Sequence, residues 1–213
     1  MTARIGVCDY GVGNVRSVER ALRAAGAEAV INDDPMTLER CDGLLLPGVG
    51  AFSPAMQRLR ESGMAAVAKG FASEGRPLLA VCLGYQMLFE HSDEGDGSGL
   101  ALLTGDVTRI ASDNIKVPHI GWNTLRLARR SPLFDGIDDG AYVYFVHSYT
   151  ATGVDDIDVI ATVDYGGPLV AAVQRGSVTG TQFHPEKSGR DGLRLYANFV
   201  AIAAASRTAA VWH

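Results

Sequence analysis

One stretch of sequence decides the fold, namely Leu78-Leu79-Ala80-Val81-Cys82-Leu83-Gly84-Tyr85-Gln86. Residues 77–81 predict a buried strand and residues 83–89 predict a helix, with almost no loop between them. A tight turn of this kind lifts the side chain at its apex to the carboxyl edge of a parallel sheet, as in a nucleophile elbow. The stretch therefore predicts an α/β fold and makes Cys82 a candidate nucleophile.

The neighbours of Cys82 suit this role. Small residues stand two positions before and after it, at Ala80 and Gly84, so a tight turn can close. The N–H of Leu83 would point toward a developing oxyanion, and the start of a helix favours a thiolate. The other interpretation is that Cys82 is a small buried hydrophobic side chain, the common fate of a free cysteine.

The other two cysteines, Cys8 and Cys41, lack such a turn, so we expect them to pack in the core. Three cysteines without a CxxC motif argue against a disulfide framework and indicate a reducing compartment. The scattered histidines predict no metal site, and no cofactor is expected.

The flanking chain has the rhythm of alternating strands and helices. Before residue 90, strands are expected at 5–10, 29–31, 43–46 and 77–81, with helices at 15–25, 52–59, 64–72 and 83–89. This alternation predicts a mainly parallel sheet. Residues 92–99 predict an exposed polar loop, and a last helix is expected at 192–204.

Short β-like runs between residues 107 and 183 predict an antiparallel extension of that sheet. They lie at 117–122, 142–146, 159–163, 169–174 and 178–183. The expected fold is thus a three-layer α/β sandwich whose mainly parallel central sheet is extended by antiparallel strands. We expect a single domain over residues 1–213.

Composition and charge exclude several functions. The chain has 213 residues, 47% of them hydrophobic, and a formal net charge of -5. No basic run indicates a nucleic-acid surface, and no apolar run reaches the roughly 20 residues that cross a bilayer. The N-terminus lacks the apolar core of a signal peptide. We expect no nucleic-acid or membrane partner and a soluble, cytoplasmic protein.

A candidate base lies at the end of another β-like run, at Phe183-His184-Pro185-Glu186. A strand end can deliver the His184 imidazole to the same sheet edge as Cys82, and Glu186 can then orient the imidazole. A histidine near a glutamate is on its own more often a surface feature. Together with Cys82 the pair predicts a catalytic triad.

A glycine turn, Pro47-Gly48-Val49-Gly50, follows the buried strand at 43–46. Glycines allow backbone N–H groups to turn toward an anion, which would complete an oxyanion hole with Val49 and Gly50. The turn is equally explained by a strand-to-helix connection that needs positive φ, and that explanation is favoured for the motif alone.

Together these motifs resemble those of the class I (triad) glutamine amidotransferases, and the resemblance covers nearly the whole chain. One position departs from the family pattern, because Ala80 stands where the family usually has glycine. Alanine is tolerable there unless its φ is positive.

A narrower resemblance is to the glutaminase subunits of imidazole glycerol phosphate synthase. It lies in Asp9-Tyr10-Gly11-Val12-Gly13-Asn14, Pro118-His119-Ile120-Gly121-Trp122-Asn123 and Tyr144-Phe145-Val146-His147-Ser148-Tyr149. The resemblance implies that glutamine is hydrolysed through a Cys82 thioester. The ammonia would pass to a (β/α)8-barrel cyclase subunit in a heterodimer. That subunit makes imidazole glycerol phosphate and aminoimidazole carboxamide ribotide in histidine biosynthesis.

The resemblance also implies roles for single residues. Val49 and Leu83 would supply oxyanion N–H groups, and Gln86 would hold the amino-acid head of glutamine. Backbone groups of three further residues would help Gln86, namely His147, Ser148 and Tyr149. We expect His119 and the side chain of His147 to be structural rather than catalytic.

Partner contact is expected at Asn14, Trp122, Tyr144 and Lys187. Each has another explanation, since Asn14 suits a helix cap, the aromatic rings suit a core and Lys187 suits a solvated surface. The resting Pro47–Gly50 turn is expected to point its N–H away from the site until the partner binds its ligand.

Three other functions stay open from the sequence. The chain could be the glutaminase subunit of anthranilate or aminodeoxychorismate synthase. It could be a non-catalytic subunit with an amidotransferase-like fold, or a cysteine hydrolase that acts on another substrate.

Overall fold

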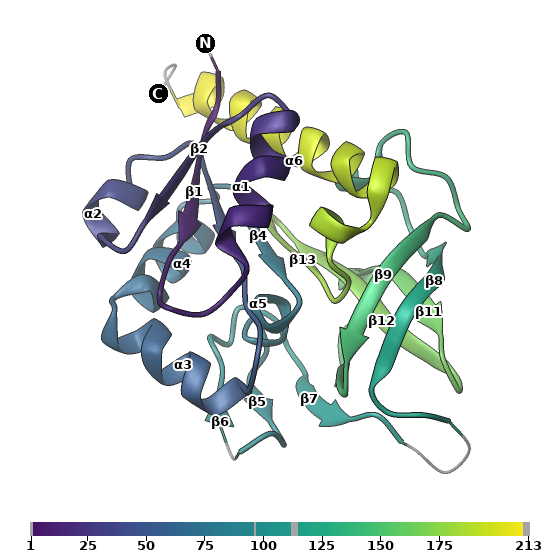
Figure 1. The fold of residues 1–213 in the computed structure, drawn as a ribbon. Coiled ribbons are helices and arrows are strands. Elements are labelled where there is room, and N and C mark those ends of the chain that lie inside the picture. The colour runs from purple at the N-terminus through teal and green to yellow at the C-terminus, as the bar shows by residue number, and fades with distance from the viewer. Residues whose placement is uncertain (1, 96, 112–114, 211–213) are drawn as a thin grey trace.

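A computed structural model describes residues 2–95, 97–111 and 115–210. Its central feature is a nine-stranded sheet in the order β2-β1-β3-β4-β13-β12-β11-β8-β9 (Figure 1). The first five strands in this order run parallel to one another: β2 (Glu28–Asn32), β1 (Arg4–Cys8), β3 (Gly43–Leu46), β4 (Leu78–Val81) and β13 (Val178–Thr181). The α/β class and the mainly parallel sheet are thereby confirmed.

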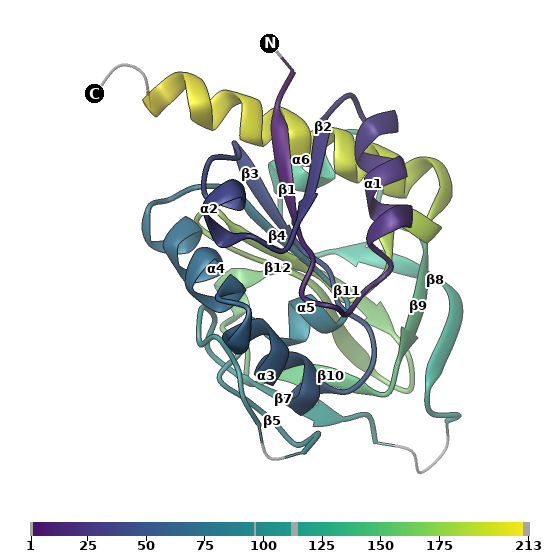
Figure 2. The ribbon, with the colours of Figure 1, turned by 60° about the vertical axis from the view of Figure 1, so that its left-hand side comes forward.

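Helices cover both faces of the parallel half (Figure 2). One face carries α1 (Val15–Ala24) and α6 (Gly189–Ala210), and the other carries α2 (Pro35–Leu38), α3 (Phe52–Glu61), α4 (Met64–Ser73) and α5 (Leu83–Gln86). Alternate residues of one strand point to opposite faces. Leu45 accordingly packs in the core beneath α1 and α6, whereas Leu44 and Leu46 pack in the other core. Burial of both faces explains the unbroken apolar run at this strand.

The antiparallel extension is confirmed as well, except that the run expected at 178–183 does not belong to it: this run forms β13, which lies parallel to β4 and closes the parallel half. Four strands form it: β12 (Pro168–Arg175), β11 (Val159–Asp164), β8 (His119–Leu127) and β9 (Tyr142–His147). The long strand β8 pairs with β9 along its first part and with β11 near its end. This sharing places β9 at the outer edge, close to the carboxyl ends of β4 and β13 (Figure 1).

A second sheet of four strands was not predicted. Its order is β10 (Tyr149–Thr152), β7 (Asp106–Arg109), β5 (His91–Ser92), β6 (Gly97–Ser98). The expectation of an exposed loop at residues 92–99 was therefore wrong in part, because β5 and β6 pair there and Ser92 is buried. Residue 96 lies outside the described residues.

Two helix boundaries also differ from the prediction. The helix expected over 83–89 ends at Gln86, since the next N–H groups, of Leu88 and Phe89, bond three residues back rather than four. The last helix is longer than expected and begins at Gly189. Short 3-10 turns occupy connections at Pro132–Phe134, Asp156–Asp158 and Pro185–Lys187.

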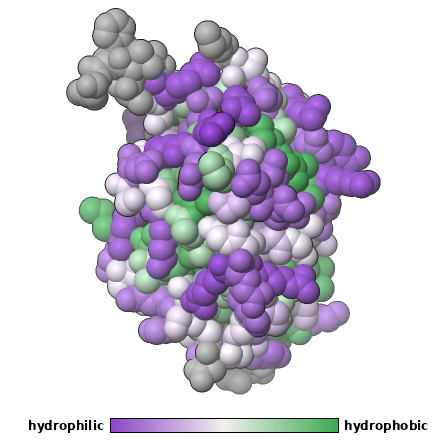
Figure 3. Space-filling model, turned by 90° about the vertical axis from the view of Figure 1, so that its left-hand side faces the viewer, coloured by the Kyte–Doolittle hydropathy of each residue, from purple (hydrophilic) through white to green (hydrophobic). Residues whose placement is uncertain are grey.

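The surface over α2, α3 and α4 is largely hydrophilic, with hydrophobic atoms scattered between the polar ones (Figure 3). None of the described helices is long and apolar enough to cross a bilayer.

Candidate active site

Three neighbouring parallel strands bring the predicted site together. In the sheet, β4 lies between β3 and β13. The chain leaves β3 at Pro47, leaves β4 at Cys82 and reaches His184 shortly after β13. Because the carboxyl ends of parallel strands meet at one edge, segments about 35 and 100 residues apart in sequence become neighbours there.

Cys82 sits in a strained turn between β4 and α5. Its φ is 56° and its ψ is -109°, and a positive φ at a residue with a side chain costs about 1–3 kcal/mol. A Cβ at Gly84 would collide with the carbonyl oxygen of Leu46, so only glycine fits this tight contact. Ala80 does not adopt a positive φ, and the alanine there fits the turn. The elbow expected from the sequence is present.

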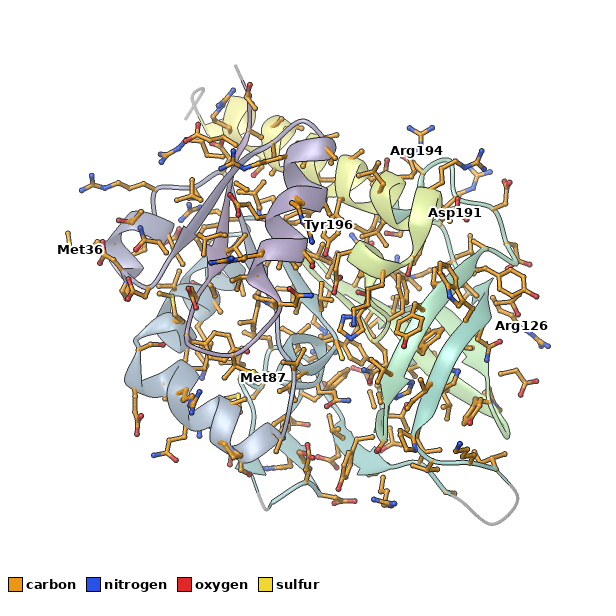
Figure 4. All side chains as sticks on the ribbon, in the orientation of Figure 1. Met36, Met87, Arg126, Asp191, Arg194 and Tyr196 are labelled. Atoms are coloured by element: carbon orange, nitrogen blue, oxygen red, sulfur yellow. The ribbon has the colours of Figure 1, made fainter. Side chains whose placement is uncertain are left out.

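His184 and Glu186 form a close pair beside this turn. The Nδ1 of His184 lies 2.7 Å from Oε1 of Glu186, and both side chains are almost fully buried. The other carboxylate oxygen of Glu186 accepts a hydrogen bond of 3.3 Å from the hydroxyl of Tyr196. Tyr196 is on α6 and points toward the interior (Figure 4). The sequence prediction missed Tyr196, which its helical spacing marks only as a core residue.

The pKa of His184 results from opposing effects. Burial lowers it, but the Cys82 sulfur and the Glu186 carboxylate together more than offset burial and raise the pKa above its usual value. The Nε2 of His184 is buried and makes no hydrogen bond to a nitrogen or oxygen atom of the described residues, and the Cys82 sulfur is among the groups that raise the pKa of this ring. This nitrogen is thus placed to exchange a proton with the thiol or with a bound substrate.

The glycine turn after β3 has a defined orientation. The N–H of Leu83 donates a 3.4 Å hydrogen bond to the carbonyl of Gly48. The carbonyl of Gly48 and the N–H of Val49 belong to one peptide and point in opposite directions when the peptide is trans. The N–H of Val49 therefore points away from that of Leu83, and the two donors do not converge in this conformation.

Two contacts hold this turn in place. The hydroxyl of Tyr10 donates a 2.7 Å hydrogen bond to the carbonyl of Pro47. A Cβ at Gly48 would lie 2.8 Å from the nitrogen of Gly84, so the turn packs against the elbow. Gly50 has a φ of 92°, a value that favours glycine, and a Cβ added there would meet nothing within 4 Å.

A cavity of about 410 Å³ lies over these groups. Its walls contain most residues that the sequence singled out, namely Val49, Gly50, Cys82, Leu83, Gln86, His147, Ser148, Tyr149, His184 and Lys187. The cavity has the size of a small-molecule site. Glu94 also lines it and was missed, because its polar segment predicted an exposed loop.

Gln86 is buried in the cavity wall and its amide is fully oriented. Its Nε2 donates to the carbonyl of Tyr149 at 3.1 Å and to Oε1 of Gln182 at 3.0 Å. Gln182 in turn directs its own Nε2 toward the Cys82 sulfur at 3.9 Å. Gln182 was quoted in the sequence motif but given no role, since its partners are 96 and 100 residues away.

Of the residues expected to contact the partner, Lys187 lines the cavity, whereas Asn14, Trp122 and Tyr144 are not among its lining residues. Trp122 is 54% exposed and meets the ring of Tyr144 edge-on, so neither ring is a fully buried core aromatic. The Nζ of Lys187 lies 5.5 Å from the Tyr144 ring. Asn14 precedes α1 but makes no side-chain capping bond. The side-chain cap that was the alternative explanation for Asn14 is therefore absent, and the residue is exposed.

Within the described residues, no group of three or more His, Cys, Asp and Glu side chains is arranged to hold a metal ion. The chemistry available at this edge is that of a buried thiol, an imidazole oriented by a carboxylate, and backbone N–H donors. This is the equipment for acyl transfer through a covalent intermediate.

Comparison with known proteins defines the family. The model of the family "Glutamine amidotransferase class-I" matches residues 6–203. The chain is 47% identical over 199 residues to "Imidazole glycerol phosphate synthase subunit HisH" of Bacillus cereus (strain G9842), covering 93% of this chain and 94% of the relative. It is 48% identical over 207 residues to the protein of the same name from Natronomonas pharaonis, again covering 93% and 94%.

Solved structures agree on the fold. A structure described as a glutamine amidotransferase aligns with a TM-score of 0.74 and 23% identity, over 94% of this chain and 98% of its own. PurLQS from Thermotoga maritima aligns with a TM-score of 0.74 and 22% identity, over 94% and 99%. The chain therefore belongs to the class-I glutamine amidotransferase family, and within it to the branch of the HisH subunits.

Proposed function

We propose that this chain is the glutaminase subunit of an imidazole glycerol phosphate synthase, which hydrolyses glutamine and delivers the ammonia to a cyclase subunit. The observation that carries the proposal is that Cys82 and His184 line one cavity and that Glu186 lies 2.7 Å from the His184 ring. The high identity to HisH subunits over most of the chain supports this synthase over the others that use a glutamine amidotransferase subunit.

The chemistry proceeds in two halves. The Cys82 sulfur attacks the side-chain carbonyl carbon of glutamine while His184 holds the thiol proton. His184 then gives this proton to the departing nitrogen, so that ammonia leaves and a γ-glutamyl thioester remains. In the second half, His184 takes a proton from water, the hydroxide attacks the thioester, and glutamate leaves as the proton returns to sulfur. Glu186 keeps the imidazole oriented throughout.

The head group of glutamine binds at Gln86 and Glu94, which line the same cavity as Cys82. Both hydrogens of the Gln86 Nε2 are committed to Tyr149 and Gln182, whereas its Oε1 accepts no hydrogen bond from the described residues. This oxygen and the carboxylate of Glu94 are suited to the α-ammonium group of glutamine. Backbone groups of His147, Ser148 and Tyr149 complete the site.

The Pro47–Gly50 turn determines whether a second N–H donor faces the oxyanion. In the observed conformation the N–H of Leu83 is occupied by the Gly48 carbonyl, so an oxyanion would meet an oxygen instead of a second donor. Rotation of the Gly48–Val49 peptide would withdraw the carbonyl and bring in the N–H of Val49. We propose that the ligand-loaded partner stabilises the rotated state, and that the free subunit is slow.

The partner surface is an exposed apolar patch on the outer face of β8 and β9. It contains Ile120, Trp122, Tyr142 and Tyr144, with Lys187 beside it. Val146 pairs with Ile120 and also lines the cavity, so the patch reaches the cavity rim. A barrel cyclase bound there, with Asn14 at its margin, could receive ammonia without release to water. We place this heterodimer in the cytoplasm, with residues 1–213 forming one domain.

The test compares two nitrogen sources. The chain and a barrel cyclase subunit are assayed for imidazole glycerol phosphate with glutamine or with ammonium salt. The Cys82→Ala variant should lose the glutamine-dependent activity and keep the ammonia-dependent activity. Loss of both activities would mean that Cys82 is structural, and retention of the glutamine-dependent activity would refute the proposal.

A further inference from the structure

Two histidines that the chemistry does not use lie side by side near the active cavity. His119 of β8 and His147 of β9 are direct cross-strand neighbours, and both are buried. The Nδ1 of His119 lies 3.1 Å from the Nε2 of His147. Beyond them, the Nδ1 of His147 lies 2.8 Å from the carbonyl oxygen of Tyr149, and the Nδ2 of Asn123 lies 3.4 Å from the Nε2 of His119.

The direction of these hydrogen bonds follows from the Tyr149 carbonyl at one end of the series. A carbonyl oxygen can only accept, so the Nδ1 of His147 carries the proton and its Nε2 is the acceptor. The Nδ1 of His119 must then donate, which leaves the Nε2 of His119 to accept from the Asn123 amide. Each ring nitrogen of His119 and His147 is thus either a donor or an acceptor. We call this series of hydrogen bonds, from the Asn123 amide through the two rings to the Tyr149 carbonyl, the histidine relay.

Two further observations fit a relay of neutral, fixed rings. Burial lowers the pKa of both His119 and His147 to about 4, so each ring is neutral near pH 7 and offers one donor and one acceptor. The His119 ring is stacked between Phe145 and Tyr165, with centroid distances of 4.6 and 3.9 Å. Stacking on both faces restricts rotation of the ring.

The relay ends on the carbonyl that orients Gln86. The Tyr149 oxygen accepts from both His147 and the Nε2 of Gln86. With this carbonyl and Oε1 of Gln182 both acting as acceptors, the Gln86 amide has only one favourable orientation, with its own Oε1 left over for a ligand. A flipped amide would place three acceptors against one another.

We propose that His119 and His147 are positioning residues for glutamine binding, which act by holding the Tyr149 carbonyl where it orients the Gln86 amide. The proposal rests on the proposed function, since it takes glutamine as the ligand of this cavity. It assigns the relay to binding rather than to bond cleavage, because no relay atom is part of the triad. The relay begins at Asn123, on the same strand as the exposed Trp122.

The first test is His119→Phe, measured as glutamate release by the chain in complex with the barrel subunit. Phenylalanine keeps an aromatic ring between Phe145 and Tyr165 but cannot donate to His147. We expect the KM for glutamine to rise on the order of ten-fold, the effect of losing one buried hydrogen bond. The kcat should stay within about three-fold, a split that a general loss of structure would not produce.

A second variant, Asn123→Leu, changes the relay from its outer end. Leucine has a similar size but lacks the amide that donates to the Nε2 of His119, so the ring is no longer held in the tautomer that donates from Nδ1 to His147. We expect the KM for glutamine to rise here too. The matched control is Tyr165→Phe, which keeps the ring stacked on His119 and changes no relay atom. Its KM should equal that of the wild type.

The tautomers give a readout that does not depend on activity. Nitrogen-15 NMR of labelled histidine in the wild-type chain should show both His119 and His147 protonated at Nδ1. Protonation at Nε2 in either ring, or an unchanged KM in a folded His119→Phe variant, would overturn the relay. A wild-type complex that releases no glutamate would instead refute the proposed function, and the NMR result would still decide the relay.

Discussion

The two halves of the central sheet contribute to the site in different ways. The parallel half carries the proposed reacting groups on the turns that leave β3, β4 and β13, where Gly48, Cys82 and His184 lie. The antiparallel half contributes part of the cavity wall through β9 and the exposed apolar patch through β8 and β9. One half holds strained turns at a fixed edge, whereas the other half presents side chains on both faces of paired strands.

The two faces of β8 and β9 explain how one pair of strands can contribute both to substrate binding and to partner binding. Cross-strand neighbours on β8 and β9 alternate between the interior and solvent, so one pair of strands can serve both substrate and partner. His119 and His147 face the interior, while Ile120 and Trp122 face solvent. We therefore expect changes in the triad of the parallel half to lower kcat, and changes on β8 and β9 to alter KM or partner affinity.

The largest expected effect is that of His184→Asn. The variant removes the proton carrier while leaving the cavity wall intact, so kcat for glutamine should fall on the order of 10³-fold or more with little change in KM. Steady-state glutamate release from the complex gives both constants. A rise in KM with an unchanged kcat would place His184 in binding and would break the division between the two halves.

Gly84→Ala should strongly destabilise the fold. Its Cβ would collide with the backbone carbonyl of Leu46, which cannot move without displacing β3 from β4. We expect a loss of about 3 kcal/mol or more in the free energy of unfolding, measured by urea denaturation. Gly70→Ala in α4 is the matched control, because its Cβ meets nothing within 4 Å and alanine favours a helix. A stable Gly84→Ala variant would contradict the packing of the elbow.

Trp122→Ala tests the outer face of the antiparallel half. An exposed aromatic side chain at the centre of an interface typically contributes about 2 kcal/mol, so the Kd for the barrel subunit should rise roughly thirty-fold. The unfolding free energy of the free chain should hardly change, because Trp122 is 54% exposed. Met36→Ala is the control, since Met36 is 64% exposed and lies on α2, across the molecule from β8 (Figure 4). Equal Kd values for the Trp122→Ala and Met36→Ala variants would exclude this patch as the surface that binds the barrel subunit.

The parallel half could be predicted closely from the sequence, because its signals are local. The apolar run of β3 and the turn at Cys82 each lie within a few residues of chain. The antiparallel strands were predicted as β-like runs, but their pairing was not. The second sheet was missed because β5 and β6 are two residues long each and their stretch is polar.

Site residues were missed where their contacts span long distances in the chain. Gln182 meets Gln86 96 residues away, and Glu94 reaches the N–H of Phe52 42 residues away. Tyr196 looks like an ordinary core position of an amphipathic helix until the fold brings Glu186 against its hydroxyl. No pattern of period two or 3.6 encodes such pairs, so only the assembled sheet reveals them.

The smallest predicted effect concerns the proton carrier itself. Glu186 is one of the groups that raise the pKa of His184 against the effect of burial, so Glu186→Gln should lower this pKa by about 1 pH unit or more. The measurement is an NMR titration of the His184 ring in a Cys82→Ala background, where the sulfur no longer contributes. Glu94→Gln in the same background is the control, because Glu94 lines the cavity but bonds to Phe52 rather than to His184. If both substitutions lowered the pKa equally, the general negative charge of the cavity, and not the Glu186 hydrogen bond, would set the protonation of His184. The protonation of His184 would then depend on a residue outside the parallel half, and the parallel half would not set its own chemistry.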